Sequence, residues 1–143
     1  MSAYDDALAR WNEYVERGGP IYARGQNTAS ARKFFREMDF RWREQIRALE
    51  GLERAGVKEV RAPKPLGARA KEVRLRPNGT GTVVISQCTD YTGARYERNG
   101  KVEKGVKPEN LVAPLIVTMR KQSTGSDWKL DGVELRGDQS CAR

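Results

Sequence analysis

The segment Leu49-Glu-Gly-Leu-Glu-Arg-Ala-Gly-Val-Lys-Glu-Val60 marks the point where the spacing of apolar residues changes. Before it, apolar side chains recur every three or four positions, which is the period of an α-helix; after it they alternate with polar ones, which is the period of a β-strand. Gly56 suits the left-handed position that follows a helix, and Val57 beside Leu52 supplies the usual hydrophobic contact. Helices followed by strands predict an α+β domain, with N-terminal helices packed on a curved antiparallel sheet.

Two helical stretches are predicted within residues 3–55. The first begins at a capping box, in which Ser2 accepts from an amide three residues on and Asp5 faces the positive helix end. Gly18, Gly19 and Pro20 are expected to end it. The second begins at Asn27 or Thr28 and continues to Ala55, with the Met38-Asp39 step as a place where it could bend or divide.

The strands are predicted within residues 57–138. Asn99-Gly100 is a strong hairpin signal, because both residues tolerate positive φ. Strict alternation over residues 111–119 contains Pro114, which predicts an edge position or a bulge since proline has no amide to donate. At Asp131-Gly132 the phase of the last strand slips by one, favouring a bulge over a tight turn. No second domain or repeat is evident, so residues 1–143 are predicted to form one domain.

Composition excludes several functions. The 143 residues include no histidine, which rules out Ser-His, Cys-His and His-based zinc sites within this chain, and neither a metal nor a cofactor is predicted. No apolar run approaches the roughly 20 residues of a membrane span. The net charge of +8 is spread, with 15 basic and 10 acidic residues in the first 71 positions and 12 and 9 in the rest. This spread argues against nucleic acid, which stays an alternative partner.

Helices followed by a long sheet that ends in a Trp-containing strand resemble the cystatin-like α+β cone of the nuclear transport factor 2-like superfamily. The segments LEGLERAGVKEV, TVVISQCTDYTG and WKLDGVELRGDQSC are similar to small extracytoplasmic proteins of high-GC Gram-positive bacteria, which are often lipid-anchored. This resemblance implies export. The sequence begins MSAYDD, without the apolar signal region or lipobox cysteine of those proteins, so a cytoplasmic location is the alternative.

In the proteins of the narrower resemblance, a cysteine followed by Thr-Asp is joined to one near the C-terminus, which implies a Cys88–Cys141 disulfide. An even number of cysteines fits an oxidising compartment, and the two can meet if the strands that precede them lie side by side. Two reduced thiols are the alternative. A catalytic Cys88 is not expected, since no histidine can activate it.

The cone of the superfamily encloses a pocket, in which several relatives use an acid for isomerase, dehydratase or cyclase chemistry. Asp39 is the only candidate for such a base here, because burial would raise its pKa. An ion pair of Asp39 with nearby arginines is the alternative, and Asp90 is expected to end its strand rather than form a binding rim. The residues expected to line the pocket are Tyr14, Phe34, Met38, Trp42 and Met119.

These observations favour a non-catalytic, extracytoplasmic interaction or ligand-binding module of the cell envelope. Its partner would be a protein or a small molecule, and a homodimer through the sheet is compatible with the fold. Contact with a membrane would need an N-terminal anchor that this sequence lacks. A small carboxylate-dependent enzyme and a basic nucleic-acid-binding protein are the alternatives.

Overall fold

The computed structural model describes residues 2–103 and 107–141. Three helices come first, α1 (Ala3–Arg24), α2 (Ala29–Met38) and α3 (Trp42–Ala55). Seven strands follow: β1 (Val57–Arg61), β2 (Lys64–Leu75), β3 (Gly81–Asp90), β4 (Arg95–Arg98), β5 (Lys101–Glu103), β6 (Val112–Lys121) and β7 (Lys129–Leu135). The predicted α+β class is confirmed, with the change from helix to strand at Gly56.

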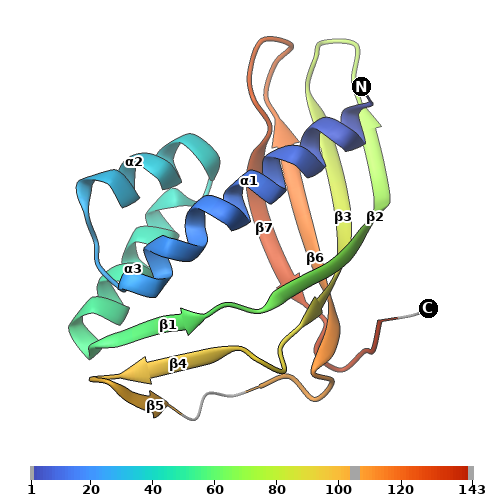
Figure 1. The fold of residues 1–143 in the computed structure, drawn as a ribbon. Coiled ribbons are helices and arrows are strands. Elements are labelled where there is room, and N and C mark those ends of the chain that lie inside the picture. Colours follow the sequence, from blue (N-terminus) through green and yellow to red (C-terminus); the bar gives the residue numbers. More distant parts are fainter. Residues whose placement is uncertain (1, 104–106, 142–143) are drawn as a thin grey trace.

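The described strands form two antiparallel sheets rather than one continuous sheet. The larger has the order β2-β3-β6-β7 and the smaller the order β1-β4-β5. In Figure 1, α1 crosses one face of the large sheet and reaches β1. Helices α2 and α3 lie beside the second half of α1. No described helix or strand covers the other face of the large sheet, which we call the open face, and the C-terminal segment that ends at Cys141 crosses part of it. The division falls where the β1–β2 connection and the β3–β4 turn carry the chain from one sheet to the other.

Local signals set most helix ends. The Ser2 hydroxyl accepts from the Asp5 amide at 3.1 Å, as the capping box predicts. Gly56 has the expected left-handed φ of 68° at the end of α3. The second helical stretch divides at Asp39, whose extended backbone pairs with Leu130 of β7.

The predicted end of the first helix at residues 18–20 was wrong. α1 continues through Pro20 to Arg24 and ends at Gly25, with a φ of 60°. A proline disfavours helical geometry in the preceding residue partly through a clash with its Cβ, and Gly19 has none. Gly18 faces Phe34 of α2, so the helix passes its neighbour closely without a side chain at that position.

Sequence signals predicted the turn and the bulge of the strands more reliably than the order of the strands. Asn99 and Gly100 have φ of 50° and 82° in the predicted hairpin, and Gly132 lies in the predicted bulge. Pro114 was wrongly expected at an edge or bulge, since it lies in β6 with β3 on one side and the end of β7 on the other. The Pro114 carbonyl accepts from the amide of Arg136, the residue just beyond the end of β7 at Leu135. The amide that Pro114 lacks is therefore at the point where the β6–β7 ladder ends.

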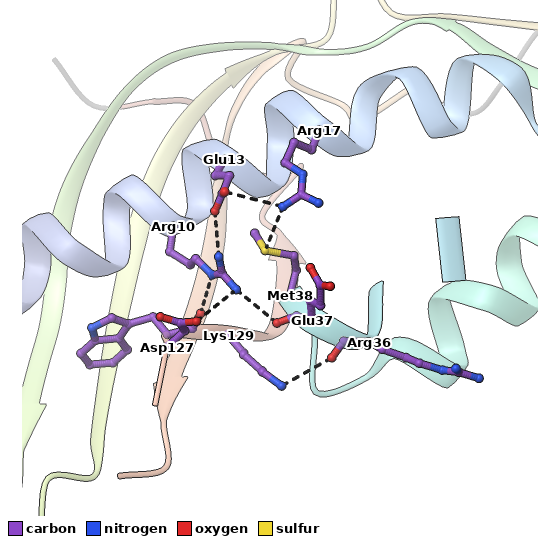
Figure 2. Close-up of polar contacts among 9 residues, drawn as sticks. Arg10, Glu13, Arg17, Arg36, Glu37, Met38, Asp127 and Lys129 are labelled. Atoms are coloured by element: carbon purple, nitrogen blue, oxygen red, sulfur yellow. Dashed lines mark hydrogen bonds and ion pairs between the residues drawn. The ribbon is translucent and has the colours of Figure 1, made fainter. Parts of the chain in front are cut away.

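The core lies between the helices and the face of the large sheet that they cover. It includes Trp11, Phe35, Leu49, Ile85 and Met119. Arg10 of α1 connects three elements at the rim of this core, as Figure 2 shows. Its guanidinium donates to the Trp128 carbonyl at 3.0 Å and to the Glu37 carbonyl at 3.2 Å, which fixes α1 against the start of β7 and the end of α2.

Candidate functional site

A hollow of about 160 Å³ lies between the second half of α1, the β1–β2 connection and the covered face of the large sheet. We call it the aromatic hollow, because four of its wall residues are aromatic. Its walls are Trp11, Tyr14, Val15, Gly18, Gly19 and Tyr22 of α1, Glu59 of β1, Ala62, Pro63, Pro65 of β2, Gln87 and Thr89 of β3, Tyr91, and Leu115 of β6.

Several polar side chains in these walls already have hydrogen-bond partners, either in the walls or just behind them. The Trp11 indole donates to Gln87 Oε1 at 2.8 Å, and the Gln87 amide donates to the Thr89 hydroxyl at 3.0 Å. Tyr22 donates to Gln45 at 2.8 Å, and Tyr14 donates to Asp39 at 3.0 Å. These bonds satisfy the buried groups and hold the aromatic rings in place.

Among the residues that the structure describes, Glu59 is the only charged one that lines the aromatic hollow. Tyr96 of β4 donates to Glu59 Oε2 at 2.7 Å, and no Lys or Arg of the described residues forms an ion pair with this carboxylate. Burial first, and then this hydrogen bond and the Glu59 charge, raise the pKa of Tyr96. Burial and then Glu59 also raise the pKa of Tyr91. The phenols around Glu59 therefore stay neutral at physiological pH.

A larger hollow of about 890 Å³ lies beside the small sheet. We call it the basic hollow, because its described wall residues include three cations, Arg61, Arg95 and Lys107, and one carboxylate, Glu103. Its apolar wall residues are Pro63, Tyr91, Ala94, Tyr96, Val102, Pro108 and Leu135. Pro63 and Tyr91 line both hollows, so the two spaces are neighbours across these side chains.

The structure places Asp39 outside both hollows. Its side chain is 1% exposed and accepts from Tyr14 and from the Arg41 amide, the latter at 2.7 Å. Burial raises the pKa of Asp39, although these two hydrogen bonds oppose the shift. Tyr14 therefore contacts Asp39, and the guanidinium groups of Arg36 and Arg43 lie over the ring of Trp42.

The other residues expected to line a pocket pack in the core. Phe34, Met38 and Met119 are at most 3% exposed and belong to one cluster. Of the predicted set, Tyr14 is the member that lines the aromatic hollow. Asp90 caps the end of β3, where its carboxylate accepts from the Thr92 amide at 2.9 Å. Hydrogen bonding to the Thr92 side chain, and then to this amide, lowers the pKa of Asp90.

Sequence reasoning missed the walls that α1 and β1 provide. The helical stripe was ended at residue 18, so Tyr22 was not assigned to it. On β1, Val57 and Glu59 share a face by the two-residue period, and Val60 lies on the other face. Val57 is 8% exposed and Val60 37%, which agrees with that period. The sequence signal that could have identified this wall is Glu59, an acidic residue on the inward face of a strand.

The predicted disulfide between Cys88 and Cys141 is confirmed, with a Cα–Cα distance of 5.8 Å. The strands before the two cysteines are not adjacent, because β6 lies between β3 and β7. The C-terminal segment instead passes over the start of β6, where the Cys141 amide donates to the Val112 carbonyl at 3.4 Å. Gln87 and Thr89 point to the aromatic hollow, so Cys88 between them points to the open face.

Two further features concern the residues that the structure describes. None of the described helices is long and apolar enough to cross a membrane. Among the described side chains, no group of three or more acidic or cysteine residues is arranged to hold a metal ion.

The fold is similar to that of the intermembrane-space region of the chloroplast protein ARC6. The TM-score is 0.52 with 10% identity, and the match covers 94% of this chain and 97% of that chain. At such low identity the similarity concerns the fold alone. No family model and no curated protein match the sequence.

Proposed function

We propose that this protein is a non-catalytic ligand-binding module that works in the oxidising, extracytoplasmic environment of the cell envelope. The observation that carries the proposal is the pair of neighbouring hollows with aromatic and aliphatic walls and few charged groups. Such a concave, largely apolar site with a small number of fixed polar groups is typical of small-molecule binding. The resemblance to the nuclear transport factor 2-like cone supports the same class of function.

The arrangement of acids favours binding over catalysis. Asp39, the only strongly buried carboxyl among the described residues, lines neither hollow and is held by Tyr14 and Arg41. Glu59 reaches the aromatic hollow, but no histidine is available as a second proton-transfer group. General acid–base catalysis needs a side chain of suitable pKa within hydrogen-bond reach of the transferred proton, and Asp39, the carboxyl whose pKa burial raises, lines neither hollow.

The chemistry of the basic hollow indicates a ligand that is amphipathic and carries a negative charge. Apolar surface from Val102 and Leu135 would contact its body, and Arg61 and Lys107 would attract its anionic group. Charges at a partly open rim act mainly on specificity and association rate, while apolar contact provides most of the affinity.

Titration with 1-anilinonaphthalene-8-sulfonate, an aromatic anion that fluoresces when it leaves water, tests this site. Leu135→Glu places a carboxylate in the apolar wall and should weaken binding at least tenfold. Leu111→Glu is the matched control, because Leu111 is also 40% exposed but lines neither hollow. Equal affinities for the two variants, with both folded by circular dichroism, would reject the basic hollow as a binding site.

The proposed compartment has a separate test. The disulfide supports an oxidising environment, because thiols stay reduced in most cytosols. Protein isolated from its native cells with a thiol-blocking reagent present, then denatured without reductant, should contain no blocked cysteines. Two blocked cysteines per chain would contradict the envelope location while leaving the hollows unaffected.

A further inference from the structure

The charge in the aromatic hollow has the opposite sign from the protein's overall charge. The chain has 27 Lys and Arg and only 19 Asp and Glu, yet the walls, as far as the structure describes them, contain Glu59 as their single charged residue. A half-buried carboxylate loses part of its hydration, and one hydrogen bond from Tyr96 replaces only part of it. A cation in the hollow would supply the missing electrostatic partner.

The aromatic walls provide a second attraction for a cation. Trp11, Tyr14, Tyr22 and Tyr91 surround the space that Glu59 enters. The face of an aromatic ring carries partial negative charge, and several rings around one site attract organic ammonium groups. Burial, then the charges of Asp39 and Glu59, raise the pKa of Tyr22, so its ring stays a neutral phenol beside the carboxylate.

The hydrogen bonding of the walls selects the kind of cation. A primary ammonium has three N–H donors that need acceptors. The side-chain acceptors of Gln87 and Thr89 already accept from Trp11 and Gln87, respectively. A primary ammonium could donate to Glu59 but would turn its remaining N–H donors toward aromatic rings, whereas a fully alkylated ammonium has no N–H donors and needs only the charge of Glu59 and contact with the rings. About 160 Å³ equals roughly five waters at about 30 Å³ each, which suits the five heavy atoms of an alkyltrimethylammonium group.

We propose that the aromatic hollow binds an alkylated ammonium group of the ligand, with Glu59 as its counter-ion and the surrounding aromatic rings as its walls. This inference rests on the proposed ligand-binding function and names part of the ligand. Because the cations of the basic hollow lie across Tyr91 and Pro63, the whole ligand is a zwitterion, with its ammonium group in one hollow and its anionic group in the other.

Choline and its uncharged isostere 3,3-dimethyl-1-butanol, titrated into the full chain by calorimetry or protein-observed NMR, separate charge from shape. Choline should bind at least tenfold more tightly than the alcohol. Glu59→Gln should reduce choline affinity at least tenfold, because the amide can still accept from Tyr96 but carries no charge. Glu97→Gln is the matched control: Glu97 is also half-buried, lies on the strand paired with β1, and does not line the hollow.

A further variant, Tyr91→Leu, keeps an apolar side chain but removes a ring and should weaken choline binding several-fold. Equal affinity for choline and the alcohol, absence of choline binding, or equal loss in Glu59→Gln and Glu97→Gln would each overturn the proposal. Anilinonaphthalene sulfonate titrated into the same samples distinguishes the failures. If it still binds and Leu135→Glu weakens it, the ligand-binding function stands and only the ammonium assignment fails.

Discussion

At the scale of single residues, Asp39 and Glu59 show how one functional group takes two roles. Both are carboxylates that accept from a tyrosine hydroxyl, at 3.0 Å and 2.7 Å. Asp39 also accepts from the Arg41 amide and is 1% exposed, so it fixes the break between α2 and α3. Glu59 has space beside it instead. Access to a hollow, rather than residue type, distinguishes the structural acid from the candidate binding group.

Stability should depend on pH through Asp39. Burial raises its folded pKa above the ordinary value of 3.8, so the folded protein holds this proton more tightly than the unfolded chain. Its contribution is therefore fully present below pH 3.8 and is lost as pH rises through the folded pKa. The free energy of unfolding, measured with urea and expressed relative to Asp39→Asn, should fall with rising pH by at most about 1.4 kcal/mol per unit.

Asp90→Asn provides the control for this experiment. Hydrogen bonds with Thr92 lower the pKa of Asp90. The contribution of Asp90 to stability is therefore present above its ordinary pKa of 3.8 and is lost only as the pH falls through the lower, folded pKa. Between pH 5 and 7 the difference between wild type and Asp90→Asn should stay constant. A constant difference for Asp39→Asn from pH 3 to 7 would contradict the raised pKa.

At the scale of elements, glycines have two different effects on the helices. Gly51 lies inside α3 with nothing within 4 Å of the position its Cβ would take. Gly25 ends α1 with a φ of 60°, and a Cβ there would lie 2.6 Å from the Val57 carbonyl oxygen. The same substitution should therefore change stability in opposite directions at the two positions.

Gly51→Ala should raise the free energy of unfolding by about 1 kcal/mol, because alanine has less backbone freedom to lose in a helix. Gly25→Ala should lower it by more than 1 kcal/mol, since the left-handed backbone and the close carbonyl both disfavour a side chain. Denaturant unfolding of the two variants beside wild type measures both changes. Stabilisation by Gly25→Ala would show that α1 does not end as described.

The sequence predicted elements where local chemistry decides and failed where distant contacts decide. The cap at Ser2, the end at Gly56 and the Asn99-Gly100 turn depend on residues a few positions apart, and all were predicted. The course of α1 through Pro20 depends on Gly19 and on packing against α2. The interior place of Pro114 depends on the strand order. Neither depends on a local pattern alone.

At the scale of the whole molecule, the candidate site was less predictable than the fold, because its walls come from distant segments. The aromatic hollow brings α1 together with Glu59, the β1–β2 connection, β3 and Leu115. The pocket predicted from the superfamily resemblance was placed among Phe34, Met38 and Met119, which are tightly packed core residues here. Of the residues predicted to line a pocket, only Tyr14 lines the aromatic hollow. The other walls were missed because the second half of α1 and the inward face of β1 were not predicted from the sequence.

The disulfide and the aromatic hollow lie on opposite faces of the large sheet, so stability and binding in this hollow should respond separately to removal of the bond. The bond joins cysteines 53 positions apart. Closing such a loop stabilises the folded state by about 4 kcal/mol in the chain-entropy model, since it restricts the unfolded chain. The Cys88→Ser, Cys141→Ser double variant should lose most of this stabilisation, measured as the free energy of unfolding in urea. Its affinity for choline should change less than twofold under conditions where it is fully folded, because Cys88 points away from Gln87 and Thr89 in the wall of the aromatic hollow. Loss of binding by a variant that keeps its near-ultraviolet circular dichroism would mean that the C-terminal segment shapes the site across the sheet.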